Sequence, residues 1–384
     1  AKAVKDYVTN NAGSGGGGGL KVRSFGATGD GVTDDAAAIQ SAVNFWAANP
    51  DQFSTIDFEG YNYYVSDTII WPNSVYGSTG KRILVTGYGS TITTDQAIPI
   101  FYRMPANQTE AGTTIADYKV TIEGIHFVGS NTTGQKAIEW GATYSAVINE
   151  CSFNNLDTAI VAEFWLGSQM TGNRFTNCSS IDIVGRNGLW SGGNASNASF
   201  NANVLSNNRH YGISSGQFAQ IYITGGDQVS IEHSVFEGSK PLYNIYMACT
   251  HSGSLVHSIE NNWFESTGGV YSANTNMYIS NAGTTKIINT QRIYADTLIN
   301  LEDLTAGAQI IFDNIPYMGN MPTNGFFNNG TNNLSGEPVS FINMGKFCED
   351  AIDGANWVTK PISVTCFGAN GTLGLHFYST NNIE

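Results

Sequence analysis

The segment "VTIEGIHF", residues 120–127, is the first clear copy of a pattern that the chain repeats. In each copy an apolar residue is followed, after four mostly polar or small positions, by a large apolar residue. The mean spacing of the copies, about 27 residues, lies within the range of ~20–50 residues that indicates a solenoid. The first anchors are Ile122, Ile148, Met170, Phe200, Ile231, Ile259, Ile288 and Phe312.

The residue types in the repeats indicate strands rather than helices. Ile, Val, Phe and Tyr alternate with polar residues at period two, and Gly, Asn, Ser and Asp interrupt them. A second short apolar segment follows most anchor pairs, at 158–162, 181–185, 211–215, 243–247, 269–273 and 298–302. Two or three short strands per coil with no intervening helix predict an all-β chain, a single-stranded parallel β-helix.

Stacked coils should align equivalent side chains in columns, because hydrogen-bonded strands lie about 4.8 Å apart. Each buried ring in such a column contributes roughly 1.5–3 kcal/mol. Asn173, Asn203 and Asn262 are expected to form a ladder at a bend, since Asn tolerates the left-handed conformation. The predicted column of second anchors is Phe127, Phe153, Phe175, Leu205, Phe236, Phe264, Ile293 and Tyr317.

An open β-helix end exposes unpaired backbone and apolar interior, so it needs a cap. The segment "DGVTDDAAAIQSAVNFWAA", residues 30–48, predicts a short amphipathic helix for this purpose. Thr33, Asp34 or Asp35 is expected as its N-cap, because a side-chain oxygen there accepts from the first free N–H groups. The face laid on the first coil would consist of Ile39, Val43 and Trp46.

The stretch "VRSFGATGDGVTDDAAAIQSAV", residues 22–43, resembles the N-terminal signature of the pectate-lyase-like right-handed β-helix superfamily. The shared pattern is F-G-A-x-G-D-G-x-x-D-D-x-x-A-I-Q, and the overall likeness is greatest to bacteriophage tailspike depolymerases. The resemblance implies a right-handed β-helix, action on a polysaccharide, and an oligomerising β element near the C-terminus of a homotrimer. Because one fold hosts many sites, it does not specify the reaction.

Three segments are expected along the chain. Residues 1–19 form an N-terminal segment with the Gly-rich linker "GSGGGGG", residues 20–320 the capped β-helix, and residues 321–384 a β-rich cap or oligomerisation segment. The first residues contain no apolar signal core and no initiator Met. We therefore expect a processed product or a fragment, in which the linker is either a joint to a further N-terminal module or a disordered end.

Charge and cysteine content narrow the classes of partner. The net charge is −14, which argues against nucleic acid or an anionic membrane as partner. No apolar run approaches the ~18 residues of a membrane-spanning helix. The cysteines lack metal-ligand spacing, so we expect buried free thiols and no cofactor or metal. They are Cys151, Cys178, Cys249, Cys348 and Cys366.

The sequence lacks the short catalytic motifs of several β-helix enzymes: those of the polygalacturonases, the Y-G-x-x-P-H motif of the epimerases and the Arg-rich calcium site of pectate lyases. Glycoside hydrolysis instead needs two carboxyl groups, ~5 Å apart for retention or ~6.5–9.5 Å for inversion. The position after the first anchor places Glu232 and Glu260 outward on neighbouring coils. Two such close like charges should raise one pKa. Asp313, two coils past Glu260, suits the inverting distance.

The acidic and aromatic candidates also have other interpretations. Outward Glu side chains are commonly solvated surface, and a register slip of one residue would turn them inward. Asp182, Asp227, Glu302 and Asp303 are competing acids. Aromatic residues are candidates for sugar binding, with core packing or a subunit interface as the alternative. These are Trp190, Tyr243, Tyr246 and Tyr271.

The sequence therefore predicts a tailspike-like protein, located on a virion tail or outside the cell. It would bind a bacterial capsular or O-antigen polysaccharide and cleave it as an endo-glycosidase, with Glu232, Glu260 and Asp313 as catalytic candidates. One alternative is a secreted exo-glucanase, polysaccharide lyase or epimerase of the same fold. A second alternative is a non-catalytic receptor-binding or structural spike.

Overall fold

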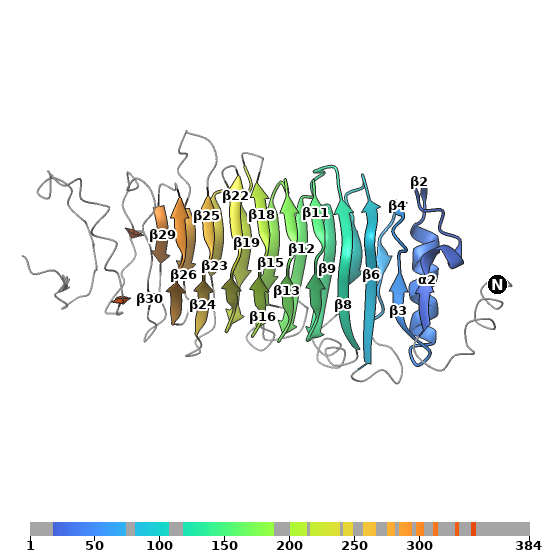
Figure 1. The fold of residues 1–384 in the computed structure, drawn as a ribbon, viewed down its shortest axis with the longest axis horizontal. Coiled ribbons are helices and arrows are strands. Elements are labelled where there is room, and N and C mark those ends of the chain that lie inside the picture. Colours follow the sequence, from blue (N-terminus) through green and yellow to red (C-terminus); the bar gives the residue numbers. More distant parts are fainter. Residues whose placement is uncertain are drawn as a thin grey trace, which may run out of the picture.

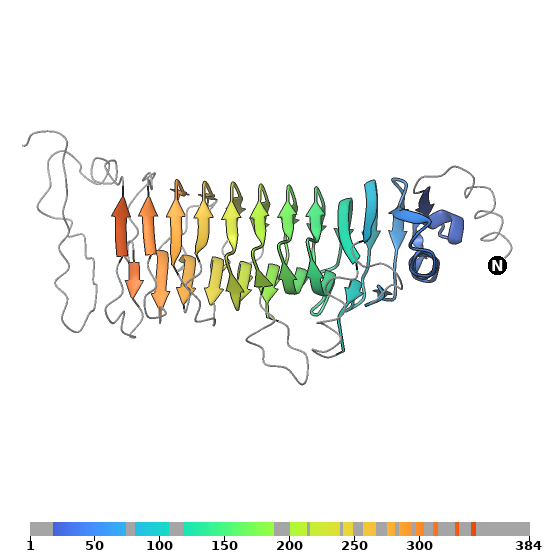
Figure 2. The same ribbon diagram turned by 90° about the horizontal axis from the view of Figure 1, so that it is seen from below.

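The computed structural model is an elongated tower of coils with a helix at its N-terminal end (Figure 1, Figure 2). Strands of successive coils pair in parallel along its length. The structure describes residues 18–73, 81–106, 118–187, 200–212, 216–238, 241–248, 256–265, 275–280, 284–293, 297–302, 310–313, 327–329 and 339–342.

Three strands make up a typical coil, and equivalent strands form three stacks. The first stack comprises β10 (Val147–Asn149), β13 (Gln169–Thr171), β17 (Val204–Ser206), β21 (Ser230–Glu232), β24 (His257–Glu260), β27 (Thr285–Ile288) and β30 (Ile310–Asp313). The second comprises β11 (Ser152–Asn154), β14 (Arg174–Thr176), β18 (Arg209–Gly212), β22 (Val235–Gly238), β25 (Trp263–Glu265) and β28 (Gln291–Ile293). The third comprises β9 (Lys136–Tyr144), β12 (Thr158–Leu166), β15 (Ile181–Arg186), β19 (Ala219–Thr224), β23 (Tyr243–Ala248), β26 (Thr275–Ser280) and β29 (Thr297–Glu302).

The N-terminal coils are built from longer and less regular strands. Strands β6 and β8 each run through both the first and the second stack, with a register irregularity between Thr86 and Ser90 where they bend. The elements of this part are β1 (Gly18–Lys21), the 3-10 turn Val22–Phe25, β2 (Asp30–Asp34), β3 (Phe53–Asp57), β4 (Asn62–Tyr64), β5 (Ile69–Ile70), β6 (Lys81–Thr93), β7 (Pro99–Arg103) and β8 (Tyr118–Val128).

The predicted cap is helix α2 (Ala36–Ala48), which buries Ile39, Val43 and Trp46 as expected. Asp35 occupies the N-cap position, but its side chain does not cap the helix. Instead its carboxylate accepts from the backbone N–H groups of Thr28 and Gly29, which fixes the preceding turn. Asp34, the other aspartate of the pair, accepts from the N–H of Ala36, the first helical residue, and from that of Ser66.

The predicted aromatic column is present. Phe127, Phe153 and Phe175 stack with centroid distances of 5.4 and 5.0 Å, and Phe236 stacks on Phe264 at 4.7 Å. Parallel rings at this spacing follow directly from the spacing of paired strands. The expected tower of coils is therefore confirmed.

The repeat pattern predicted the wrong register for one coil. Met170 pairs with Leu205, so Leu205 belongs to the first anchors, and Phe200 lies in β16 (Phe200–Asn201). The ring column instead contains His210, stacked at 4.8 Å on both Phe175 and Phe236. This coil spans 35 residues from Met170 to Leu205, and its strand β16 pairs with β20 (Gly226–Asp227) of the next coil. Phe200 and Leu205 have the spacing of an anchor pair, so the repeat pattern assigns them to the two columns. A pattern of apolar residues does not detect the buried His210.

Two further register corrections follow from the pairing. Ile259 pairs with Ile287, not Ile288, and Phe264 pairs with Arg292, not Ile293. The expected Tyr317 lies outside the described residues.

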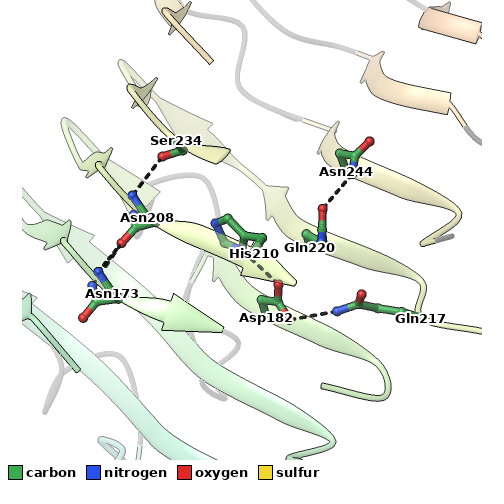
Figure 3. A network of polar contacts seen from close by, with 8 residues as sticks. All are labelled: Asn173, Asp182, Asn208, His210, Gln217, Gln220, Ser234 and Asn244. Carbon is green, nitrogen blue, oxygen red and sulfur yellow. Dashed lines mark hydrogen bonds and ion pairs between the residues drawn. The ribbon is translucent and has the colours of Figure 1, made fainter. Parts of the chain in front are cut away.

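The polar ladder also differs from the prediction. The backbone N–H of Asn173 donates to Asn208 Oδ1, and that of Asn208 to Ser234 Oγ (Figure 3). The N–H of Ser234 then donates to Asn262 Oδ1. Asn203 serves a different corner, where it accepts from the N–H of Ser168. Asn173 and Asn262 were predicted correctly, and Asn208 takes the place assigned to Asn203.

The described cysteines are inert. Cys151 and Cys178 are buried free thiols, as predicted. Burial raises the pKa of Cys151 to about 12 and raises that of Cys178 as well. Cys249, Cys348 and Cys366 lie outside the described residues.

Beyond residue 320, β31 (Phe327–Asn329) and β32 (Val339–Ile342) pair in parallel with β29 and β30. These strands continue the stacked sheets into the segment that the sequence predicts to be a separate cap or oligomerisation element. The boundary at 320 itself stays a prediction.

Candidate active site and aromatic face

The predicted acid pair lies in the first stack. Glu232 ends β21 and Glu260 ends β24, and the two residues are direct partners in the parallel register. Ile231 and Ile259, which precede them, are fully buried, so the glutamate side chains point outward and are half-buried. Neighbouring strands place their backbones about 4.8 Å apart. The register predicted for this pair is therefore present.

Polar neighbours surround the pair at the next corner. The Ser258 hydroxyl donates to a Glu260 carboxylate oxygen. His233 and Asn261 directly follow the two glutamates in left-handed conformation, with φ of 51° and 55°. Their side chains meet, with Asn261 Nδ2 3.3 Å from His233 Nε2. A small polar group thus borders both carboxylates.

Asp313 lies farther along the same stack. Glu260 pairs with Ile288, and Ile288 pairs with Asp313. The backbone of Asp313 is therefore two coils from Glu260, about 9–10 Å at the spacing of paired strands. This places the three acidic positions in one line along the tower.

The tyrosines lie on the outward face of the third stack. Tyr222, Tyr246 and Tyr278 occupy one register position on β19, β23 and β26. Their rings stack at 5.0 and 4.3 Å. Tyr243 and Phe218 pack against this ladder at 5.2 and 5.4 Å from the Tyr246 ring. We call Phe218, Tyr222, Tyr243, Tyr246 and Tyr278 the aromatic face.

The packing decides how the aromatic face can contact a ligand. Tyr246 has a neighbouring ring on both of its faces, so only the edge of its ring is left for contact with a ligand. Phe218 is 38% exposed and offers an apolar surface beside these edges. The adjacent outward position carries Thr224 and Ala248, which bear no charge. Sugar hydroxyls can bond to such edges, whereas stacking of a sugar ring on Tyr246 is excluded.

Of the predicted binding residues, Tyr243 and Tyr246 both lie on β23, within the strand segment expected at 243–247. Trp190 and Tyr271 lie outside the described residues. The acid pair is in the first stack and the tyrosines are in the third, so the structure does not bring the two sets together. Tyr222, Tyr278 and Phe218 were missed. The recurrence of tyrosine at one position in three successive coils could have identified Tyr222 and Tyr278.

A second set of acids lies in the third stack and was also missed. Glu139 and Glu163 point outward from β9 and β12, with their side chains only 13% and 6% exposed. Lys136 bonds Glu139 at 2.8 Å, and Arg186 Nε bonds Glu163 at 2.6 Å. The pKa of Tyr102 on the neighbouring β7 is raised by burial and then by these two carboxylates. Each carboxylate has its own cation, which suits a structural role.

The competing acids named from the sequence have different environments. Asp182 is buried and bonded to His210 Nδ1 at 2.8 Å and to Gln217 Nε2 at 2.8 Å (Figure 3). Asp227 is also buried, so neither faces solvent. Asp303 lies outside the described residues, and only the backbone of Glu302, in β29, is described.

The described parts of the chain contain no group of three or more His, Cys, Asp or Glu side chains arranged to hold a metal ion. Helix α2, with 13 residues, is too short to cross a bilayer, and these parts contain no longer apolar helix.

Comparison with known proteins identifies the fold. No protein-family model and no curated protein matches the chain. The tailspike protein of Acinetobacter baumannii phage AM24 aligns with a TM-score of 0.50 and 13% identity, over 84% of this chain and 54% of the tailspike. ORF18 of Geobacillus virus E2 aligns with a TM-score of 0.46 and 16% identity, over 89% of this chain and 60% of that protein. The chain thus spans less than two thirds of both phage proteins.

A bacterial enzyme is similarly close. DFA-IIIase from Arthrobacter chlorophenolicus A6, solved without its lid in complex with GF2, aligns with a TM-score of 0.51 and 10% identity. The alignment covers 88% of this chain and 96% of the enzyme. At such identities the likeness shows the fold alone. The right-handed, tailspike-like parallel β-helix predicted from the sequence is therefore confirmed.

Proposed function

We propose that this protein binds and cleaves a bacterial surface polysaccharide, as an endo-glycosidase of the tailspike type. The observation that carries the proposal is the in-register, outward-facing pair of Glu232 and Glu260 on adjacent strands. Their separation of one strand spacing agrees with the ~5 Å at which retaining glycosidases hold their two carboxyl groups.

The two glutamates would have distinct roles. Glu260 accepts a hydrogen bond from Ser258, which orients one carboxylate oxygen and suits a nucleophile that attacks the anomeric carbon. Glu232 would protonate the leaving glycosidic oxygen and then deprotonate the water that hydrolyses the glycosyl-enzyme. Asp313 is the alternative partner of Glu260, at a separation close to that of an inverting pair.

The aromatic face would hold the polymer at a second place on the tower. Its phenol edges and the apolar Phe218 combine hydrogen bonding with hydrophobic contact, as sugars require. Two separate contact surfaces are compatible with a long polymer and favour cleavage within it. The fold shared with a phage tailspike supports a location on a virion tail or outside the cell, and a homotrimer.

Two other functions are compatible with this fold. A lyase, an epimerase or an exo-glucanase of the same fold would also use this surface. A non-catalytic spike or adhesin is favoured by one observation, because the acid pair and the aromatic face lie on different stacks.

The test is incubation with capsular and O-antigen polysaccharides. New reducing ends indicate a hydrolase, an unsaturated sugar a lyase, and binding without shortening of the polymer an adhesin. Glu232→Gln and Glu260→Gln should each lower the rate at least 100-fold, following the usual contribution of general acid–base groups of about 10²–10⁴.

The matched control is Glu123→Gln. Glu123 occupies the same outward register position on β8, where its partner is Asn149 rather than a second acid. It should keep wild-type activity. Full activity of both Glu232→Gln and Glu260→Gln would overturn the site assignment and leave the fold unaffected.

A further inference from the structure

Two arginines occupy neighbouring positions on the outward face of the second stack. Arg174 begins β14 and Arg209 begins β18, and they are direct partners in the register. Both are exposed. Like charges placed directly opposite on paired strands repel each other. The chain has only 17 basic residues against 31 acidic ones, so two cations at adjacent positions call for an explanation.

The backbone that carries these arginines is held firmly. The buried Asn173 and Asn208 precede them in the ladder, and Asn173 Nδ2 also donates to Asn208 Oδ1 at 3.2 Å (Figure 3). The following residues, Phe175 and His210, stack in the core at 4.8 Å. The two Cα positions are therefore fixed one strand spacing apart before any ligand binds.

No carboxylate satisfies the two guanidinium groups within the described part of the chain: neither arginine is within 4.0 Å of an acidic oxygen there. Arg174 lies 5.0 Å from the ring centroid of Tyr211, which holds it by a cation–π contact. Its charge also contributes, after burial, to lowering the pKa of His126 in the same outward column. The outward face also carries Glu237, opposite Tyr211 on the next strand. The two arginine positions themselves concentrate positive charge on an acidic protein.

The arginines adjoin the proposed catalytic pair across one corner. Four consecutive coils read TGNR at 171–174, SNNR at 206–209, EHSV at 232–235 and ENNW at 260–263. The first letter of each points outward from the first stack and the last from the second stack. Along this corner, two cationic coils are followed directly by the two coils of Glu232 and Glu260.

We propose that Arg174 and Arg209 bind the carboxylate of an acidic sugar, such as a uronate, in the polysaccharide that the neighbouring glutamates cleave. This inference rests on the proposed function and specifies its substrate class. Guanidinium groups suit a carboxylate because they offer paired N–H donors in a fixed plane. A polymer lying along the corner would place its acidic residue a few sugars from the cleaved bond.

The experiment compares acidic bacterial capsular polysaccharides with their carboxyl-reduced forms, in which an uncharged CH2OH group replaces each carboxylate. Wild-type protein should bind acidic polymers and lose at least tenfold in affinity after reduction. Arg174→Gln and Arg209→Gln should each weaken binding about tenfold, the effect of one charged hydrogen bond, with unchanged binding to reduced polymers. Binding is measured by surface plasmon resonance, and cleavage is measured in a separate assay. The arginine site is therefore tested by binding alone, whether or not the protein cleaves the polymer.

The matched control is the double variant Arg82→Gln, Lys119→Gln. It removes another pair of register-matched cations, from β6 and β8, and keeps the same net charge as Arg174→Gln, Arg209→Gln. Equal loss in both double variants, or wild-type binding by Arg174→Gln, Arg209→Gln, would overturn the proposal. Competition by inorganic phosphate but not by glucuronate would also contradict it, because the site would then recognise a phosphate.

Discussion

Replacement of His210 tests how the polar group inside the aromatic column is held. His210 is fully buried between Phe175 and Phe236, with interplanar angles of 5° and 4°. Its Nδ1 lies 2.8 Å from Asp182 Oδ2. Phenylalanine at this position would keep the stacking but remove the ring nitrogen that bonds the buried Asp182, whose remaining side-chain partners are Gln217 and the Cys178 thiol. His210→Phe should therefore destabilise the protein, although it completes a column of phenylalanines.

The magnitude follows from the buried partner. Removing one partner of a buried hydrogen bond costs about 1–3 kcal/mol, because the other partner is left unsatisfied away from water. The ring contacts, worth about 0.5–1.5 kcal/mol each, are retained. The double variant His210→Phe, Asp182→Asn replaces the carboxyl group that has lost its partner and keeps an amide oxygen as acceptor for Gln217. It should lose only about 1–2 kcal/mol, close to the cost of one hydrogen bond.

The assay is urea unfolding followed by circular dichroism, with refolding checked for reversibility. The single variants His210→Phe and Asp182→Asn and the double variant form a thermodynamic cycle that isolates the coupling between His210 and Asp182. We expect His210→Phe to be less stable than the double variant. A His210→Phe protein as stable as wild type would refute the reasoning, since Asp182 would then need no partner at this position.

Three further predictions concern stability. His257 is buried, its Nδ1 accepts from the N–H of Val229, and burial lowers its pKa to about 4 from an ordinary 6.5. Between these two pKa values the unfolded chain binds more protons than the folded protein, so the free energy of unfolding should fall by up to about 3 kcal/mol as the pH drops from 6.5 to 4. Melting measured as a function of pH should show a smaller fall for His257→Asn. Trp46→Ala in the cap should cost about 3–5 kcal/mol in urea unfolding, and an unchanged midpoint would show that α2 is not required. Asn208→Ala removes the acceptor of the Asn173 N–H and the donor to Met170, and should cost about 1–3 kcal/mol by the same assay.

Much of the fold could be predicted because its columns have a chemical signature. Phe127, Phe153, Phe175, Phe236 and Phe264 repeat at coil spacing, and apolar burial alone identifies their positions. The coil that contains His210 could not be placed in this way. A histidine enters an apolar column only when a partner such as Asp182 satisfies its nitrogen, and that partner lies in another stack.

The candidate site was predictable only in part. Glu232 and Glu260 were assigned as neighbours because both follow a first anchor, and the pairing of β21 with β24 agrees. The tyrosines were predicted to bind sugar, but side-chain packing between coils occupies the faces of the Tyr246 ring, on which a sugar ring would stack. Such packing depends on rotamers that a repeat pattern does not specify. The arginine pair was missed because the wrong register separated Arg174 from Arg209.

The most direct test of the central claim is the stereochemistry of cleavage, followed by proton NMR of the anomeric signal immediately after the polymer is cut. Adjacent carboxylates at Glu232 and Glu260 predict a first product that retains the configuration of the substrate. A first product of inverted configuration would contradict this pair. Failure to shorten any polysaccharide that the protein binds would contradict the enzymatic function itself.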